Sequence, residues 1–309
     1  MKNTWTTDNI PDLSGKIIII TGANSGIGFE SAREFAREGA EVIFACRNRN
    51  KAEAAIHKLQ TELPGSKLEF IELNLSDLQS IRRFAQSFLS SHQRLDILLN
   101  NAGIMMVPYG MTEDGFERQI GTNHLGHFAL TGLLIDSLLN TQSSRVVNVS
   151  SNAHYSGELD LDDLIYQKGN VYSRQKAYNT SKLANLLFTY ELQRRFENNS
   201  GDAIAVAAHP GIANTSLADH FFERWFVKPL RPLMGLMFQS AAMGALPSIR
   251  AAVDPTVIGG QYYGPDGSGE RSGFPVLVES IQISHDLNDA KKLWKFSEEL
   301  TGIQYLPLV

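Results

Sequence analysis

Segments with the pattern of buried strands alternate along most of the chain with segments that have the pattern of amphipathic helices. The first strand pattern, Ile17 to Ile20, consists only of β-branched residues. It is followed by "GFESAREFAREG", where Phe29, Ala32, Phe35 and Ala36 recur at helical spacing. A short run that is apolar at every position is typical of a strand covered on both faces, as in a parallel sheet.

The same alternation continues to about residue 211 and predicts a doubly wound parallel sheet with helices on both faces, an α/β fold. Further strands are predicted at 40–46, 67–75, 95–103, 144–151 and 203–211, with a short one at 259–264. Helices are predicted at 51–63, 77–91, 126–139 and 178–196. No repeat or linker divides residues 1–309, so we expect one domain, with a core at 16–215, a helical lid at 216–245 and a C-terminal helix within 280–309.

The predicted lid interrupts the alternation. It is rich in large apolar residues, among them Phe221, Phe222, Trp225 and Phe226. Such a cluster can cover an apolar substrate, touch a membrane or a second subunit, or simply pack between helices. We favour the lid. In the C-terminal segment, a helix should start at Asp286 or Asn288 and stop at Gly302, with its apolar residues packed inward: Leu293, Trp294, Phe296 and Leu300.

Composition and charge exclude several classes of protein. A formal net charge of -5 disfavours non-specific nucleic-acid binding. Cys46 is the only cysteine, which excludes an intrachain disulfide and a metal site built on several cysteines. His124 and His127 lack a third ligand at useful spacing, so we expect no metal. No run has signal-peptide character or the ~18 apolar residues of a membrane helix, so we expect a cytoplasmic protein without a transmembrane segment.

A glycine-rich loop joins the first strand to the first helix. The sequence "TGANSGIG" places Gly22, Gly26 and Gly28 there, which is the position of a dinucleotide site in a Rossmann-type fold. Glycines let the backbone approach a pyrophosphate, and the helix N-terminus attracts its charge. The second strand ends in Cys46 and Arg47. A guanidinium suits the 2′-phosphate of NADP, whereas a carboxylate there would favour NAD.

A tyrosine and a lysine share one helical face at Tyr178 and Lys182. A nearby cation stabilises a phenolate and lowers the pKa of the tyrosine, so the pair can donate and accept a proton. Such a pair is often only structural. Here a strand also ends in Ser150 and Ser151, whose hydroxyls could hold a substrate oxygen. His154 lies just after the two serines and His209 just before Pro210. We expect both histidines to be structural or to line the substrate site.

Together these motifs resemble the classical short-chain dehydrogenase/reductase family, over roughly residues 16–264. The wording "FACRN", "TNHLGHF", "RVVNVSS" and "SKLANLLFTYEL" is similar to its retinol-dehydrogenase-like branch. The resemblance implies an NADP(H)-dependent enzyme that interconverts a lipophilic alcohol and its ketone or aldehyde. It also implies pairing into a homo-oligomer. Animal members of that branch often carry an apolar N-terminal anchor, which is not seen here.

The resemblance also implies residue roles. Tyr178 would be the acid/base, Lys182 would lower its pKa and bind the nicotinamide ribose, Ser151 would hold the substrate oxygen, and Asn123 would hold a water that joins Lys182 to solvent. The other residues implied in cofactor binding are Gly22, Asn24, Ser25, Gly26, Ile27 and Gly28 for the pyrophosphate, Arg47 for the 2′-phosphate, Asn74 and Leu75 for adenine, Asn101, Ala102 and Gly103 for the ribose, and Pro210, Gly211, Ile212 and Thr215 for the nicotinamide end.

Two features depart from the family pattern. Asn74 stands where an aspartate usually meets the adenine, so we expect a weaker contact there. The 27 positions between Ser151 and Tyr178 are about twice the usual spacing, and we expect the extra residues to pack beside the substrate mouth. Two alternatives remain: a reductase of an activated C=C bond on the same fold, and a non-catalytic NADP(H)-sensing protein.

Overall fold

The predicted parallel sheet is confirmed in the computed structural model, which describes residues 4–165, 171–199, 201–212 and 239–305. The sheet has the strand order β3-β2-β1-β4-β5-β6-β7-β8. All neighbouring pairs are parallel except β7 and β8, which are antiparallel. The strands are β1 (Ile17–Thr21), β2 (Glu41–Cys46), β3 (Lys67–Glu72), β4 (Ile97–Asn100), β5 (Arg145–Val149), β6 (Ile204–Ala208), β7 (Tyr262–Pro265) and β8 (Pro275–Leu277).

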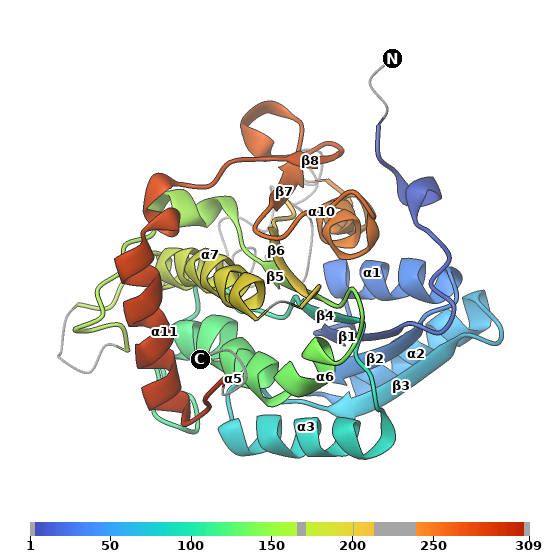
Figure 1. Cartoon of the computed structure of the whole chain (residues 1–309), viewed down its shortest axis with the longest axis horizontal. Coiled ribbons are helices and arrows are strands. Elements are labelled where there is room, and N and C mark those ends of the chain that lie inside the picture. The colour runs from blue at the N-terminus through green and yellow to red at the C-terminus, as the bar shows by residue number, and fades with distance from the viewer. Residues whose placement is uncertain (1–3, 166–170, 200, 213–238, 306–309) are drawn as a thin grey trace, which may run out of the picture.

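Helices cover both faces of the sheet because the strand residues alternate between two apolar clusters (Figure 1). Ile18 and Ile20 face α1 (Gly26–Arg37), α2 (Arg49–Glu62) and α10 (Ala241–Val253). Ile19 faces the other layer, which consists of α3 (Leu78–Ser91), α5 (Gly126–Leu133), α6 (Ile135–Leu139) and α7 (Arg174–Asn198). The strands are therefore apolar on both sides, as the run Ile17 to Ile20 predicted.

The C-terminal helix is also confirmed. Helix α11 (Leu287–Thr301) begins at the N-cap Asp286 and ends at Gly302, whose φ of 62° is the left-handed conformation that a glycine adopts readily. Leu293 and Trp294 are buried, and Phe296 and Leu300 pack at the edge of the same core. Helix α11 lies beside α7 in Figure 1.

The remaining short elements form the loops around the sheet. They are η1 (Thr7–Asn9), α4 (Arg118–Ile120), the π-helical turn η2 (Gly121–Leu125), η3 (Asn152–Ser156), η6 (Ser268–Glu270) and η7 (Gln282–His285). Most of the predicted lid, residues 213–238, lies outside the described residues. Its last five residues, 241–245, do not belong to a separate lid. They open α10, and Ala245 is buried against the sheet.

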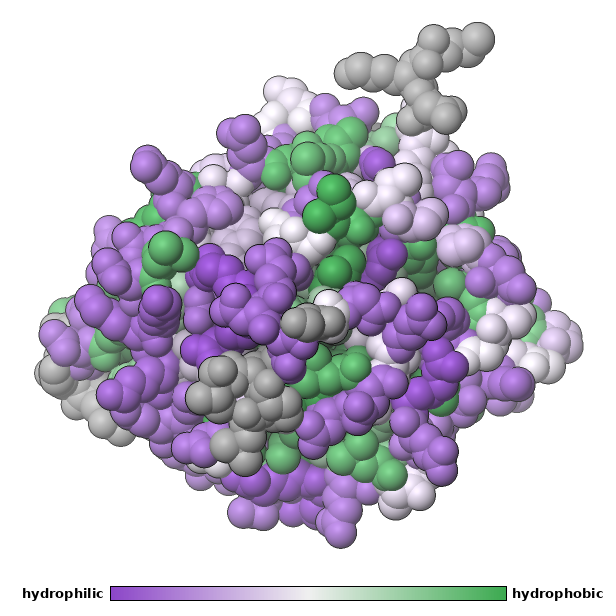
Figure 2. Space-filling model, viewed as in Figure 1, coloured by the Kyte–Doolittle hydropathy of each residue, from purple (hydrophilic) through white to green (hydrophobic). Residues whose placement is uncertain are grey.

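On the face of the molecule seen in Figure 2, apolar residues form separate groups among predominantly hydrophilic ones. In the part of the chain that the structure describes, no helix is both long enough and apolar enough to cross a membrane.

Candidate active site

The glycine loop packs tightly against the neighbouring strand connection. Gly22 has a φ of 71°, and a Cβ on Gly28 would lie 2.6 Å from the carbonyl oxygen of Gly22 and 2.6 Å from Asn101 Nδ2. Only glycine at position 28 lets α1 start this close to the end of β1. The loop is therefore built around backbone atoms, as the predicted pyrophosphate site requires.

We expect Gly28→Ala to lower the free energy of unfolding by about 1–3 kcal/mol, because the new methyl group must displace backbone atoms. Urea unfolding measures this change. Gly201→Ala is the matched control, since the nearest atom to a Cβ there is 4.0 Å away. Equal free energies of unfolding for the two variants would contradict the prediction, because the tight packing at Gly28 would then not exclude a methyl group.

Thr21, the last residue of β1, links the glycine loop to the loop that follows β4. Its hydroxyl oxygen accepts hydrogen bonds from the backbone N–H groups of Asn101 and Ala102, both at 2.9 Å. Asn101 Nδ2 donates in return to the Thr21 carbonyl oxygen at 2.8 Å. The two segments that were predicted to bind the cofactor are thus fixed to each other.

A cleft of about 590 Å³ opens beside these loops. Of the predicted cofactor residues it is lined by Gly22, Asn24, Arg47, Asn74, Leu75, Ala102 and Gly103. Arg47 is exposed at the carboxyl end of β2. Cys46 lies beside it but is 2% exposed, and burial raises the pKa of its thiol to about 11. The predicted residues Ser25, Gly26, Ile27 and Gly28 lie at the N-cap and first turn of α1, and Asn101 lies in the loop after β4; none of them lines this cleft.

Asn74 already uses its side-chain oxygen. Oδ1 accepts a hydrogen bond from the Ser76 N–H at 3.2 Å. A carbonyl oxygen has two lone pairs, so one remains for a ligand. Leu75 next to it is buried, and its carbonyl oxygen would lie 2.5 Å from a Cβ on Gly126. The close packing of α5 thus fixes this wall of the cleft.

Asn123 lies in the π-helical turn η2 and is fully buried. Its side chain holds the loop after β4, because Oδ1 accepts from the Ile104 N–H and Nδ2 donates to the Ile104 carbonyl, both at 2.9 Å. Nδ2 also lies 3.0 Å from Ser181 Oγ on α7. A Cβ on Gly103 would meet both Asn123 Oδ1 and Lys182 Nζ, at 3.3 and 3.6 Å. Asn123 and Lys182 therefore both approach Gly103 from the side on which a side chain would lie.

Tyr178, Lys182 and Ser151 come together at the carboxyl end of β5. Tyr178 and Lys182 are both buried on α7, and Lys182 Nζ lies 5.7 Å from the centre of the Tyr178 ring. Lys182 Nζ donates to the Val149 carbonyl at 3.0 Å. Burial raises the pKa of Tyr178 to about 12, and the nearby hydroxyl of Ser151 partly opposes that rise. The Ser151 hydroxyl therefore lies close to the Tyr178 phenol.

We expected the pKa of Tyr178 to be lowered, but it is raised, because burial is the largest influence on it. The same burial lowers the pKa of Lys182 to about 8. The phenol therefore stays protonated near neutral pH, and the chain presents Tyr178 as a proton donor.

We expect Lys182→Met to stabilise the protein at pH 7 by roughly 1–3 kcal/mol, because folding buries an ammonium there. The pKa of Lys182 is about 8 in the folded state and near the ordinary lysine value of 10.5 when unfolded, so the unfolded state binds more protons between these values. Wild-type stability therefore rises with pH across this window. Asn185 Nδ2 also donates to the Val149 carbonyl, so the variant leaves that oxygen paired.

Urea unfolding at pH 7 and again near pH 10 tests this prediction, since the advantage of Lys182→Met should shrink across the window. The control is Lys295→Met, whose side chain is 79% exposed. A variant that is less stable than the wild type at pH 7 would contradict the prediction.

Ser150 and Ser151 point to different partners. Ser150 is 2% exposed and its hydroxyl donates to the Lys182 carbonyl at 2.9 Å, which fixes β5 against α7. Ser151 is half-buried, caps η3 by accepting from the Ala153 N–H at 3.2 Å, and lies near enough to Tyr178 to oppose the rise of its pKa. The arrangement supports Ser151 as the serine that meets a substrate oxygen.

The turn after β6 is held by a loop that the sequence did not indicate. Ile212 N–H donates to the Arg271 carbonyl at 2.7 Å, and a Cβ on Gly211 would lie 2.5 Å from the same oxygen. His209 is fully buried, accepts from the Gly211 N–H at 3.3 Å, and places Nε2 3.0 Å from Glu270. Pro210, Gly211 and Ile212 therefore form one rigid turn, whereas Thr215 lies outside the described residues.

The long segment between Ser151 and Tyr178 packs along α7 and near α11 as far as it is described. Leu164 and Ile165 are buried beside Leu183 and Leu187 of α7. Thr180 Oγ1 donates to the Glu158 carbonyl at 2.8 Å. Residues 166–170 lie outside the described residues.

Several residues of the site neighbourhood were missed by sequence reasoning. Tyr172 OH donates a hydrogen bond to the buried carboxylate of Glu117 at 2.8 Å. Gln119 Oε1 accepts a hydrogen bond from the Met106 N–H at 2.7 Å. These bonds tie the loop after β4 to the start of α7. Their only sequence signal was the polar character of buried positions, which is visible only once burial is known.

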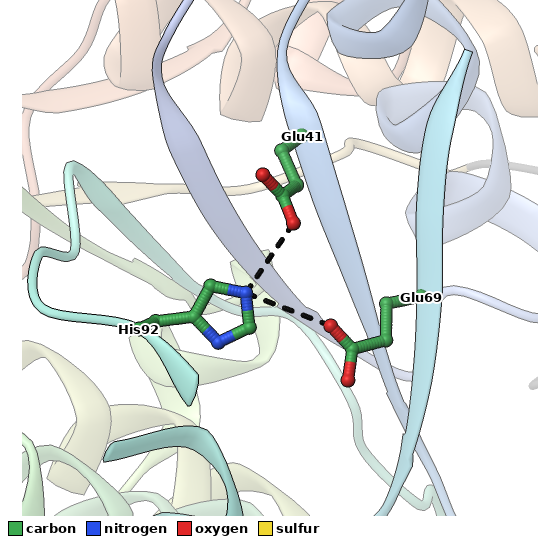
Figure 3. Close-up of side chains that lie close together, drawn as sticks. All are labelled: Glu41, Glu69 and His92. Carbon is green, nitrogen blue, oxygen red and sulfur yellow. Dashed lines mark hydrogen bonds and ion pairs between the residues drawn. The ribbon is translucent and has the colours of Figure 1, made fainter. Parts of the chain in front are cut away.

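Among the described residues, one group combines a histidine with two carboxylates (Figure 3). His92 Nε2 lies 3.3 Å from Glu41 and 3.5 Å from Glu69, and the His92 ring stacks on Phe88. Glu41 is the first residue of β2, so the group lies away from the carboxyl ends of the strands that form the cleft. These contacts are accounted for by a hydrogen bond between the His92 ring and Glu41 and by the stacking of the ring on Phe88.

The comparisons with known proteins agree with this architecture. A family model described as short chain dehydrogenase matches residues 16–161. Human retinol dehydrogenase 14 is 42% identical over 308 residues, covering 94% of this chain and 88% of its own length. Human polyprenol dehydrogenase is 39% identical over 300 residues, covering 95% of this chain and 87% of its own. An uncharacterized protein from Mycobacterium paratuberculosis superposes with a TM-score of 0.82 at 41% identity, over 98% of this chain and 99% of that one.

These relatives share about 40% of their residues with this chain and match nearly the whole of it. The chain therefore belongs to the short-chain dehydrogenase/reductase family of oxidoreductases, within its retinol-dehydrogenase-like branch. Both the fold and the family predicted from the motifs are confirmed.

Proposed function

We propose that the protein is an NADP(H)-dependent oxidoreductase that interconverts a lipophilic alcohol and its ketone or aldehyde. The observation that carries the proposal is the buried phenol of Tyr178, placed beside Lys182 and close to the hydroxyl of Ser151. Such a phenol is a proton donor and acceptor for an oxygen held at Ser151.

The residues at the cleft fit a dinucleotide. Gly22 and Gly28 leave room for the close approach of a pyrophosphate, and α1 begins directly behind them. Arg47 supports NADP(H) rather than NAD(H), because its exposed guanidinium follows β2 on the wall of the cleft. A cofactor of this class supplies hydride transfer when bound.

The chain's own residues then manage the proton and the substrate oxygen. Ser151 would hold the oxygen beside Tyr178, and Tyr178 would give its proton as a carbonyl becomes an alcohol. Lys182 would hold the cofactor ribose and place a positive charge next to the phenol. Asn123 would hold the water through which Tyr178 and Lys182 recover a proton.

The substrate class follows from the relatives. Retinol dehydrogenases and a polyprenol dehydrogenase are named for long apolar alcohols, and they match this chain over nearly its whole length. We therefore propose an apolar alcohol or carbonyl compound of this kind as the substrate.

The test is oxidation of NADPH by the purified protein with retinal, a long-chain polyprenal and a small water-soluble ketone as separate substrates. NADH runs in parallel, and Tyr178→Phe serves as the inactive control. We expect turnover with the apolar substrates, faster with NADPH than with NADH. Turnover of the small ketone alone would contradict the proposed substrate class.

The two alternatives predict different outcomes of the same assay. Enoyl reductases of this fold usually space the tyrosine and lysine more widely than Tyr178 and Lys182. The plant-type C=C reductases that keep this spacing rely on a cysteine near the substrate, whereas the only cysteine here, Cys46, is buried at the cofactor end of the cleft. A sensor would bind NADPH without turning over any substrate. NADPH binding with no turnover would therefore replace the proposed function with the sensor.

A further inference from the structure

The ring of His127 is buried between two segments of the site. It lies on α5 and is 2% exposed. Its Nε2 is 2.9 Å from Thr21 Oγ1 at the end of β1, and its Nδ1 is 3.0 Å from the carbonyl oxygen of Asn123 in η2. The ring therefore bridges the start of the glycine loop and the turn that holds Asn123.

The partners of the ring determine where its proton sits. The Asn123 carbonyl can only accept, so Nδ1 must carry the hydrogen. Thr21 Oγ1 already accepts from the Ala102 N–H and from the Asn101 N–H, which it shares with the Leu99 carbonyl, so both of its lone pairs are engaged. Its own hydrogen is left to donate, and Nε2 at 2.9 Å is nearer than the Leu99 carbonyl at 3.5 Å.

Only one tautomer satisfies all these bonds. With hydrogen on Nε2 instead, Thr21 Oγ1 would face three donors and the Asn123 carbonyl would face a lone pair. An imidazolium would meet the same conflict at Thr21. Burial, the largest influence, lowers the pKa of His127 to about 4, and the charge of Lys182 adds to the lowering. The ring therefore remains neutral near pH 7.

We propose that His127, as the neutral Nδ1–H tautomer, is a positioning residue that fixes the cofactor loops and the Asn123 turn to each other. Thr21 orients Asn101 and Ala102, and Asn123 holds Ile104, so one ring joins three segments. The inference rests on the proposed function, because these segments are the proposed cofactor and proton-relay residues. His127 touches neither substrate nor cofactor and acts through Thr21 and Asn123.

The test compares His127→Phe with His127→Gln. Phenylalanine fills the space but leaves the Thr21 hydroxyl and the Asn123 carbonyl without their partner. Glutamine offers one donor and one acceptor, as the neutral ring does. We expect His127→Phe to raise the Kd for NADPH about 10- to 100-fold and to lower kcat as well, since two buried bonds are lost. We expect His127→Gln to recover most of the affinity.

His124 supplies the matched control. It lies in η2, is 1% exposed, and bonds Ser297 on α11 at 2.9 Å, away from the cleft. We expect His124→Phe to lose stability but to keep the Kd for NADPH within about twofold of the wild type. Nitrogen-15 NMR of the wild-type imidazole should show the hydrogen on Nδ1.

Two results would overturn the inference. One is a His127→Phe variant that binds NADPH and turns over like His124→Phe, because His127 would then be only structural. The other is an NMR signature of the Nε2–H tautomer. A wild-type chain that binds NADPH but reduces no carbonyl compound contradicts the proposed function alone, and the binding measurements still decide the role of His127.

Discussion

Replacing Tyr178 with phenylalanine is expected to lower kcat by about a thousandfold, within the range that loss of a general acid produces. The variant removes one oxygen atom from a site that is otherwise unchanged. Ser151 keeps its η3 cap, and Lys182 keeps its bond to the Val149 carbonyl. The Kd for NADPH should therefore stay within about threefold of the wild type. Steady-state kinetics and fluorescence titration measure the two effects separately.

The direction of the reaction should matter to the pH profile of the wild type. Because the pKa of Tyr178 is about 12, the phenol is protonated at neutral pH and is ready for carbonyl reduction. Alcohol oxidation needs the phenol to accept a proton, so its rate should rise with pH while reduction stays level. A profile with the opposite slopes would contradict the assignment of Tyr178.

A control for the loss of a buried phenol lies on the same helix. Tyr190 is 6% exposed, and its hydroxyl bonds Ser280 at 2.8 Å, away from the cleft. Tyr190→Phe should keep kcat within about twofold, since it removes a structural bond only. If Tyr178→Phe retained as much activity as Tyr190→Phe, Tyr178 would not be the acid.

The elements that the sequence predicted well are those whose pattern is local. Ile17 to Ile20 forms a strand because every residue is β-branched and apolar. Strand β8 was missed because Pro275 to Leu277 is too short for a pattern and is fixed by its antiparallel pairing with β7. Its position depends on tertiary contacts.

Helix α10 shows a second limit. Pro247 lies in its interior, where a proline costs roughly 3 kcal/mol, so the sequence reads as a break. Burial of Ala245, Leu246 and Ile249 against the sheet and α1 offsets that cost. Local propensity and tertiary packing disagree here, and packing decides.

The candidate site divides in the same way. The motif residues were found from spacing, because i and i+4 share a helix face and the ends of parallel strands meet at one edge. The bond between Thr21 and His127 joins residues 106 positions apart, and no spacing rule connects them. The pKa of Tyr178 was misjudged for a related reason, since burial raises it and burial cannot be read from the motif.

The second large effect is expected at Arg47, and it concerns the choice of cofactor. Arg47→Gln should raise the Kd for NADPH about 10- to 100-fold, because the proposed charged hydrogen-bond partner of the 2′-phosphate is lost. The Kd for NADH should hardly change. Arg47→Asp should go further and favour NADH, since a carboxylate at the end of β2 binds a ribose hydroxyl and repels a phosphate.

Arg49 is the matched control for the positive charge, because it lies two residues further on at the start of α2. Its guanidinium bonds Glu53 at 3.1 Å and stacks over Phe70 at 4.7 Å, so it is already engaged. Arg49→Gln removes the same charge and should leave the preference for NADPH in place. If Arg49→Gln and Arg47→Gln weakened NADPH binding equally, the preference would come from the general positive field at this end of the cleft, and Arg47 would have no specific contact with the 2′-phosphate.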